Sequence, residues 1–306
     1  MKNMIPRKRK KNALNDLPAM RESILFDLGD TTWDLGRTTL VMGILNVTPD
    51  SFSDGGVHSS VEAAVERALV MDREGAHIID VGGESTRPGA EPVSLDEEIA
   101  RTIPVIEGIR EKSDIPISID TNKSEVAVRA AGAGASIIND ISALSFDPNM
   151  AKTASALGLS VVLMHIKGKP RDMQNNPRYE DLVGEISDYL EDSLKRAAAH
   201  GIDRKRIILD PGIGFGKTWE DNLTIIRNIP AFTRLGQPVL IGASRKGFIG
   251  GILDKDVRNR ASGSVGAACA AALWGAHIVR VHDVAQTVDA LKVVDAVRCG
   301  VMPSDG

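Results

Sequence analysis

The sequence predicts a single (β/α)8 barrel with its active site at the carboxyl ends of the strands. Eight short apolar runs alternate with amphipathic stretches, and most of these runs end in a polar residue. Strands that are apolar throughout and alternate with helices indicate a parallel sheet that is covered on both faces. Eight such units in about 250 residues match a closed barrel. A doubly wound open sheet is the alternative, but eight regular units without a linker favour the barrel.

The expected strands are rich in β-branched residues. They cover residues 41–46, 77–83, 116–120, 136–140, 160–165, 206–210, 238–244 and 276–282. The expected helices cover residues 61–73, 95–111, 123–133, 148–157, 182–200, 219–228, 264–274 and 283–297. We expect the barrel domain to span residues 37–300, between a polar, partly disordered segment at residues 1–36 and a short tail at residues 301–306.

Composition and charge exclude several classes of protein. The 306 residues carry a formal net charge of −4, which argues against a general nucleic-acid surface. We interpret the basic run at residues 7–11 as a solvated tail, and an arm for nucleic acid or a membrane surface is the alternative. No run approaches the ~20 apolar residues of a membrane span. Cys269 and Cys299 lack a metal-ligand spacing, so we expect a reduced, cytoplasmic protein.

Polar residues at the ends of the expected strands give the strongest sign of a site. Any one of them can be a helix cap or a turn residue, but the carboxyl ends of barrel strands point into one mouth. Asp120, Asn139 and Asp210 end three separate strands. Together they form an acceptor-rich rim that suits the N–H groups of a pterin or guanine ring. A structural network on the barrel floor is the alternative.

Two polar loops follow the first two strands. The first, at residues 46–56, contains Asn46, whose neutral oxygen suits magnesium beside phosphate oxygens. Asp54 in the same loop can assist this charge balance. The second loop is Gly-rich and contains Thr86 and Arg87, which can bind an anion. An ordinary surface loop is the alternative for the second one.

Residues 210–218 only partly match a nucleotide-binding P-loop. The tripeptide Gly-Lys-Thr at residues 216–218 fits that pattern, but Pro211 stands where the P-loop requires a glycine five positions before Gly216. We therefore reject a P-loop. Phe215 in this Gly-rich loop instead suits an aromatic wall for a flat substrate.

Positive charge gathers after the last two strands. Lys246 can reach a ring carbonyl or a phosphate, and Gly247 begins an expected helix whose free N–H groups favour an anion. Alternation places Arg280 and His282 on one face of the last strand, turned into the barrel. The loops after the seventh and eighth strands are the usual phosphate site of this fold. A plain helix cap is the alternative for His282.

Together these segments resemble the dihydropteroate synthase family, in the family's order. The matching stretches are residues 46–56, 80–89, 119–121, 139–140, 163–165, 210–216, 244–246 and 280–282, within residues 38–298. The first loop, Ser-Arg-Lys and Arg-Val-His are the most specific elements. Methyltetrahydrofolate-dependent methyltransferases share the barrel and the pterin carboxylates, but we do not expect these three elements in them.

The resemblance implies condensation of 6-hydroxymethyl-7,8-dihydropterin pyrophosphate with p-aminobenzoate, catalysed by a magnesium-dependent homodimer that is a sulfonamide target. The residues implied for the pterin are Asp120, Asn139, Met164, Asp210 and Lys246. Those implied for the pyrophosphate are Thr86, Arg280 and His282, with Asp54 and Arg87 on closing loops. Those implied for p-aminobenzoate are Pro88, Phe215, Lys246 and Gly247. Asn46 would coordinate Mg²⁺, and the expected catalytic set is Asp54, Arg87, Lys246, Arg280 and His282.

The chain departs from the family at one position of the amine site. The family usually has Ser after Ser-Arg-Lys, where this chain has Gly247. That Ser helps to hold the p-aminobenzoate carboxylate, so the amine contacts and sulfonamide sensitivity stay open, while the pterin site is unaffected. Two other functions are possible for such a barrel. A pterin-binding methyl-transfer module would have a corrinoid partner and would need no pyrophosphate pocket. A non-catalytic pterin-binding barrel would lose the strand-end carboxylates, which this chain retains.

Overall fold

The computed structural model describes residues 21, 23–28, 31–47, 56–85 and 89–301 and confirms the predicted barrel. Eight parallel strands form its sheet: β3 (Leu40–Asn46), β4 (Ile78–Gly82), β5 (Ile117–Asp120), β6 (Ile137–Asp140), β7 (Ser160–Met164), β8 (Ile207–Asp210), β9 (Leu240–Ile241) and β10 (Ile278–Val281). Their order is β8-β7-β6-β5-β4-β3-β10-β9. A parallel bridge between Leu209 and Val239 joins the two edges and closes the barrel.

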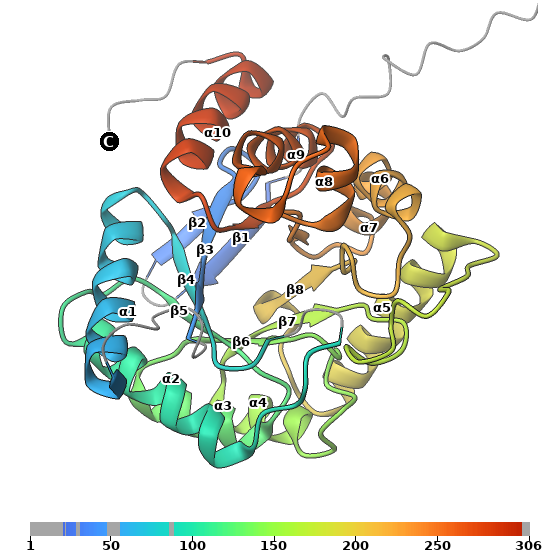
Figure 1. Cartoon of the computed structure of the whole chain (residues 1–306). Helices are drawn as coiled ribbons and strands as arrows, with labels where there is room; N and C mark the ends of the chain where they lie inside the picture. The colour runs from blue at the N-terminus through green and yellow to red at the C-terminus, as the bar shows by residue number, and fades with distance from the viewer. Residues whose placement is uncertain (1–20, 22, 29–30, 48–55, 86–88, 302–306) are drawn as a thin grey trace, which may run out of the picture.

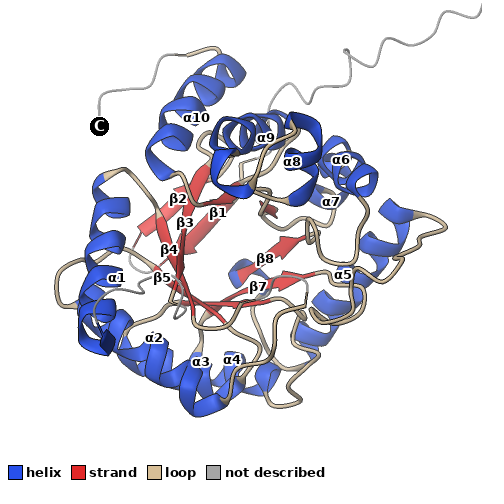
Figure 2. Cartoon of the chain, in the orientation of Figure 1, coloured by secondary structure: helices blue, strands red, loops and turns tan. Residues whose placement is uncertain are grey.

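The helices form a ring around this sheet (Figures 1 and 2). They are α1 (Gly56–Arg73), α2 (Leu95–Arg110), α3 (Ser124–Ala133), α4 (Met150–Leu157), α5 (Leu182–Ala199), α6 (Trp219–Arg227), α7 (Ile229–Thr233), α8 (Gly247–Leu253), α9 (Ala261–Leu273) and α10 (Val284–Cys299), with 3-10 turns η3 (Arg204–Arg206) and η4 (Val257–Asn259). Eight match expected helices, and α8 begins at Gly247 as expected. The sequence analysis missed α7, which has proline in its first turn. In the described part of the chain, no helix is long and apolar enough to cross a membrane.

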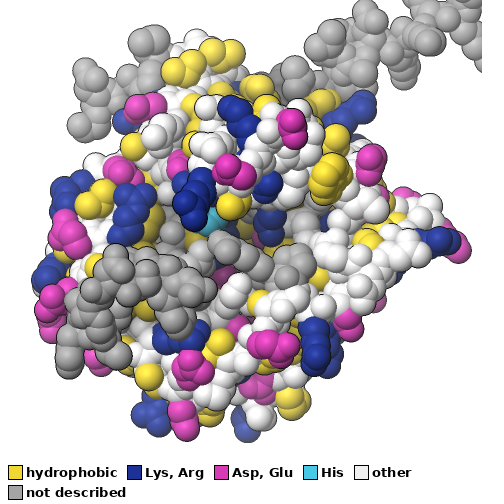
Figure 3. Space-filling model, viewed as in Figure 1, with side chains coloured by type: hydrophobic (Ala, Val, Ile, Leu, Met, Phe, Trp, Pro, Cys, Tyr) yellow, Lys and Arg dark blue, Asp and Glu magenta, His cyan; other side chains and the backbone are white. Residues whose placement is uncertain are grey.

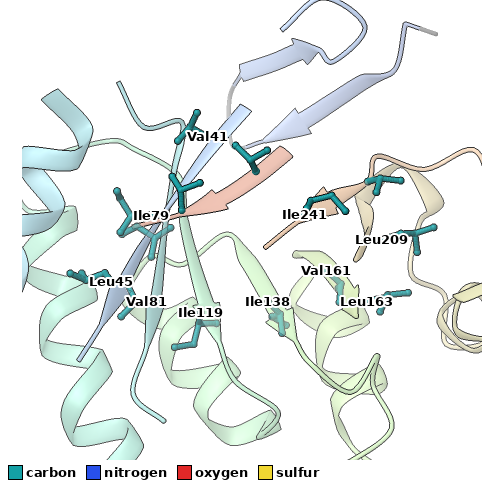
Figure 4. Close-up of a cluster of buried hydrophobic side chains, with 14 of the residues drawn as sticks. Val41, Leu45, Ile79, Val81, Ile119, Ile138, Val161, Leu163, Leu209 and Ile241 are labelled. Carbon is teal, nitrogen blue, oxygen red and sulfur yellow. The ribbon is translucent and has the colours of Figure 1, made fainter. Parts of the chain in front are cut away.

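Strand side chains alternate between two apolar cores, because successive residues of a strand point to opposite faces. One set packs between the strands and the helices (Figure 4); it includes Val41, Ile79, Ile119, Ile138, Val161, Leu163, Leu209 and Ile241. The other set fills the barrel interior near the amino ends of the strands; it contains Leu40, Met42, Ile78, Ile137, Val162, Ile208, Leu240 and Ile278. This second set forms an apolar floor for the barrel.

A β-hairpin completes that floor. Strands β1 (Leu25–Leu28) and β2 (Thr31–Asp34) pair antiparallel. Phe26 and Leu35 are almost completely buried in the cluster of the floor. This hairpin was not expected when residues 1–36 were set apart from the barrel, because each of its strands has only four residues and Asp27, Thr31, Thr32 and Asp34 interrupt the apolar ones.

Further along the strands, the inward positions become polar. The residues that share this inward direction are Asn46, Asp80, Asp120, Asn139, Asp210 and Arg280. All but Asp80, which lies in the middle of β4, are at or near the carboxyl ends of their strands, which is where barrel enzymes bind substrate. The fold therefore places a charged layer directly above an apolar floor.

Candidate active site

A row of residues that pair in register forms one side of the barrel mouth. Asn46 on β3 lies opposite Gly82 on β4, which in turn lies opposite Asp120 on β5. Asp120 pairs with Asn139 on β6. Gly82 leaves a gap in this row, since a Cβ built there would lie 3.4 Å from the Asp120 Cβ and 3.8 Å from the Asn46 Oδ1. The register therefore brings the residue expected for magnesium beside two residues expected for the pterin.

Arg280 occupies the centre of the mouth. Its Nε donates to Asp80 Oδ2 at 2.5 Å, and its Nη2 donates to Asp120 Oδ2 at 2.7 Å. Burial lowers the pKa of the guanidinium, but the adjacent carboxylates outweigh burial and raise it above its ordinary value. Asn139 Nδ2 also donates to Asp80 Oδ2, at 3.2 Å, which turns the amide oxygen of Asn139 away from Asp80. Asp80 is fully buried and thus fixes two site residues at once.

Both expected pterin carboxylates are protonated more easily than an ordinary aspartate. Burial raises the pKa of Asp120 to about 7, although the Arg280 charge opposes the shift. Burial also raises the pKa of Asp210 to about 6, against the backbone N–H of Gly212 and the charges of Lys246 and Lys217. Both groups therefore titrate near neutral pH, as groups at functional sites often do.

An apolar wall adjoins this charged layer, since Met164 on β7 pairs in register with Asp210 on β8. Phe215 and Met164 belong to one small buried cluster, whose other members are Ile141, Ile166 and Met173. The Lys246 Nζ lies 4.2 Å from the centroid of the Phe215 ring, within the range of a cation–π contact. The structure thus brings three predicted substrate residues, Met164, Phe215 and Lys246, to one wall.

His282 and its neighbours close the basic side of the mouth. The His282 Nδ1 lies 3.0 Å from Ser244 Oγ, which also accepts the backbone N–H of His282 at 3.2 Å. Arg245 points elsewhere, and its guanidinium forms two hydrogen bonds with the Asp283 carboxylate, at 2.6 and 3.2 Å. Figure 3 shows Lys and Arg side chains and a histidine beside a hollow near the centre of this face.

Four predicted site residues lie outside the described residues: Asp54, Thr86, Arg87 and Pro88. The basic run at residues 7–11 lies outside them as well. Among the described residues, no group of three or more His, Cys, Asp or Glu side chains could hold a metal ion. Asn46, the residue expected for magnesium, lies beside the gap at Gly82.

Not every polar residue at a strand end enters the mouth. The Asp140 carboxylate accepts hydrogen bonds from the backbone N–H groups of Ser142 and Leu144, at 2.8 and 2.9 Å. It shapes the following turn, in which Ala143 and Leu144 have positive φ angles. His165 packs edge-on against Tyr189, with ring centroids 4.8 Å apart. Asp140 and His165 thus have structural roles, which was the alternative given for single polar residues at strand ends.

Sequence reasoning missed the role of Asp80. It lies in the middle of an apolar strand, so no loop motif marks it. Alternation carries the missing signal, because Asp80 has the same inward parity as the gap residue Gly82. A lone buried acid on an inward strand position requires a positive partner, and Arg280 is an inward arginine on β10, separated from β4 by β3 alone.

The chain is similar to known proteins over most of its length. The sequence pattern of a family described as "Pterin binding enzyme" matches residues 42–282. A dihydropteroate synthase of Synechocystis sp. is 51% identical over 270 residues, which cover 88% of this chain and 93% of that protein. A Yersinia pestis dihydropteroate synthase solved with a sulfonamide drug complex superposes with a TM-score of 0.85 at 43% identity, covering 90% of this chain and 99% of that one. A Xanthomonas albilineans dihydropteroate synthase solved with 4-aminobenzoic acid has a TM-score of 0.84 at 46% identity, covering 90% and 98%.

Proposed function

The chain belongs to the dihydropteroate synthase family of pterin-binding enzymes, and on that premise we propose how its residues perform the reaction. The substrates are 6-hydroxymethyl-7,8-dihydropterin pyrophosphate and p-aminobenzoate, and the products are 7,8-dihydropteroate and pyrophosphate. The observation that carries the proposal is the inward set of Asp120, Asn139 and Asp210 beside the wall of Phe215 and Lys246. One ring system with several N–H groups and two flat faces fits both features.

The polar rim offers acceptors to the pterin. The Asn139 amide nitrogen donates to Asp80, so its oxygen faces the mouth and accepts from the ring. The Asp120 and Asp210 carboxylates accept the remaining N–H groups in charge-assisted hydrogen bonds. Met164 lies against the face of the ring, and Lys246 reaches its carbonyl oxygen.

The substitution is dissociative in character. The bond between the pterin methylene carbon and the pyrophosphate oxygen breaks, and its electron pair leaves with pyrophosphate. Asp120 and Asp210 stabilise the positive charge that the pterin ring then carries, and Arg280 and His282 stabilise the leaving group. The amine lone pair forms the new C–N bond, and the amine then loses its extra proton to the released pyrophosphate or to water. The amine is nucleophilic without activation, so the site requires no strong general base.

A magnesium ion fits this site as a metal that arrives with the substrate. Bound Mg²⁺ would neutralise the charge of the leaving pyrophosphate. Mg²⁺ usually takes only one or two protein ligands and completes its shell with phosphate oxygens and water. Asn46 provides such a single oxygen, beside the gap at Gly82. Asp54, Thr86 and Arg87 would complete the pyrophosphate side from the two loops, and Pro88 the amine side.

A second copy of the chain would cover an apolar face on the outside of the barrel. Helix α9 contains no charged residue, and Gly266 on its outer face is exposed. On the neighbouring α10, the Val293 and Val297 side chains are 64% and 73% exposed and lie one turn apart. Exposed apolar patches of this kind mark protein interfaces. We infer that α9 and α10 form a homodimer interface.

The homodimer is tested by light scattering on the purified chain. Val297→Lys should shift the molar mass from two chains toward one, because it places a charge in the apolar interface. Val128→Lys on α3 is the matched control and should leave the mass unchanged. A monomeric parent chain, or a dimer that Val297→Lys does not weaken, would refute this interface.

The catalytic function is tested by incubating the enzyme with the pterin pyrophosphate, p-aminobenzoate and Mg²⁺. Release of pyrophosphate should require all three and should be matched by formation of dihydropteroate. Sulfonamides should compete with p-aminobenzoate. Pyrophosphate release that is independent of the amine would contradict the proposal.

A further inference from the structure

Lys217 is the lysine of the Gly-Lys-Thr tripeptide that the P-loop hypothesis left unexplained. Its side chain is almost completely buried, at 2% exposure, and in the described part of the chain it forms no salt bridge. The neighbouring Thr218 hydroxyl caps α6 by accepting the Asp221 N–H at 3.2 Å. Neither residue therefore faces a nucleotide, and a buried lysine without a carboxylate partner requires another explanation.

The terminal amino group of Lys217, whose pKa burial lowers to about 7, contacts a histidine and a backbone carbonyl. Its Nζ lies 2.9 Å from His165 Nδ1 and donates to the Phe215 carbonyl oxygen at 2.9 Å. Burial, together with the Lys217 charge, lowers the pKa of His165 to about 2, so the imidazole is neutral and its Nδ1 can accept. The His165 ring is itself fixed by its edge-on contact with Tyr189. Lys217 thus connects a rigid part of the barrel to the backbone of Phe215.

The loop around Phe215 is held tightly at both flanks. A Cβ at Gly212 would lie 1.9 Å from the His165 carbonyl oxygen, and one at Gly216 would lie 2.3 Å from the Lys167 carbonyl oxygen. Both glycines have positive φ angles. The backbone therefore lies directly on the segment that follows β7, and Phe215 sits between these two fixed points.

The hydrogen bond from Lys217 acts on Phe215, the residue whose ring forms part of the apolar wall. The Phe215 ring lies beneath Lys246 Nζ at 4.2 Å. The Phe215 carbonyl and the Phe215 ring are attached to the same Cα, so a hydrogen bond that fixes the carbonyl restricts where that Cα, and with it the ring, can lie. Lys217 holds the carbonyl from the protein interior, since its side chain is almost completely buried.

We propose that Lys217, supported by His165, is a positioning residue for the amine substrate, because it anchors the Phe215 carbonyl and so holds the Phe215 ring in the amine subsite. The inference rests on the proposed function, which places p-aminobenzoate against Phe215. Lys217 does not touch either substrate. It sets the wall against which the aryl ring packs.

A double-mutant cycle separates this role from general structural support. Lys217→Met should raise the KM for p-aminobenzoate about tenfold and change kcat by less than about threefold. Phe215→Leu should raise the same KM by a similar factor. If Lys217 acts through the Phe215 ring, the p-aminobenzoate KM of the double variant should exceed the larger of the two single-variant KM values by no more than about twofold. A rise in KM equal to the product of the two single rises would overturn the proposal.

Pterin affinity provides the second readout. It is measured by calorimetry at pH 8, where Asp210 is ionised with or without the Lys217 charge, and it should stay within about twofold of the parent. A loss of pterin affinity as large as the rise in the amine KM would also overturn the proposal. Lys205→Met, at an exposed lysine that precedes the amino end of β8, is the matched control. If Lys217→Met does not fold, Lys217→Gln, which keeps a neutral donor, enters the same cycle with a smaller expected effect. Absence of pyrophosphate release by the parent chain would instead refute the proposed function.

Discussion

Arg280 on β10 and Asp120 on β5 meet across the barrel interior, with the guanidinium Nη2 2.7 Å from the carboxylate Oδ2. Two strands, β3 and β4, separate them in the sheet. The contact joins a residue assigned to the pyrophosphate to one assigned to the pterin. When negative charge leaves the pterin with pyrophosphate, the electrostatic potential at both residues therefore changes. The pterin subsite and the pyrophosphate subsite are thus electrostatically coupled.

The pterin carboxylates should dominate pterin affinity. Asp120→Asn and Asp210→Asn should each weaken pterin binding by about 1.5–3 kcal/mol, because each removes a charge-assisted acceptor. Isothermal titration calorimetry measures the loss. Asp192→Asn, at an exposed residue of α5, should bind the pterin as the parent does. Unchanged affinity in both site variants would exclude this pocket.

Pterin binding should release protons below neutral pH. The pKa of Asp120 is about 7 and that of Asp210 about 6 in the ligand-free enzyme, yet both must be ionised to accept N–H groups. Affinity should therefore fall as the pH decreases from 8 to 5.5. Calorimetry at pH 6 in buffers of different ionisation enthalpy gives the number of protons released, and Asp120→Asn should release fewer. Proton uptake on binding would have the wrong sign for this arrangement.

The gap at Gly82 should be essential for turnover. An added Cβ would meet Asp120 and Asn46 only at 3.4 to 3.8 Å, which is ordinary contact, so Gly82→Ala should fold. The methyl group would nevertheless occupy the space between these two site residues, and we expect kcat/KM to fall at least about tenfold. Gly132→Ala, where nothing lies within 4 Å of the added Cβ, should keep full activity. Full activity of Gly82→Ala would show that neither substrate nor metal enters this gap.

A serine at position 247 should improve the amine site. Gly247 does not have a left-handed backbone, and a Cβ there would meet only Trp219 Nε1, at 3.4 Å, so serine fits without strain. One hydrogen bond from its hydroxyl to the p-aminobenzoate carboxylate is worth about 1.5–3 kcal/mol before water is displaced. Gly247→Ser should lower the KM for p-aminobenzoate and leave that for the pterin unchanged. An unimproved amine KM at an unchanged melting temperature would place residue 247 away from the carboxylate.

Turnover should depend on magnesium through Asn46. Exhaustive chelation should abolish pyrophosphate release, and added Mg²⁺ should restore it. Asn46→Ala should raise the Mg²⁺ concentration for half-maximal activity, since the carboxamide oxygen is lost. Thr39→Ala, near the other end of the same strand, controls for damage to β3. Undiminished turnover after chelation would remove the assigned role of Asn46.

The sequence predicted the barrel and its mouth because both depend on local periodicity. Their places at strand ends were enough to direct Asp120, Asn139 and Asp210 into the mouth, and alternation along one strand turned Arg280 inward. All four lie on inward positions in the structure. The same reasoning failed where the decisive contact joins distant strands. Asp80 gains its role only from Arg280 and Asn139 on other strands, and Lys217 only from the fold of its loop onto His165. A buried charge inside an apolar run carries no local sign of its partner.

The hairpin that completes the barrel floor also constrains the order of assembly during synthesis. Phe26 is made more than 200 residues before Leu240 and Ile278, which belong to the same floor. Contacts so distant in sequence form late, because a long loop must close before they gain free energy. The docking surface of the hairpin therefore stays incomplete until β9 and β10 are made, and β1 and β2 are among the last strands to reach their final place.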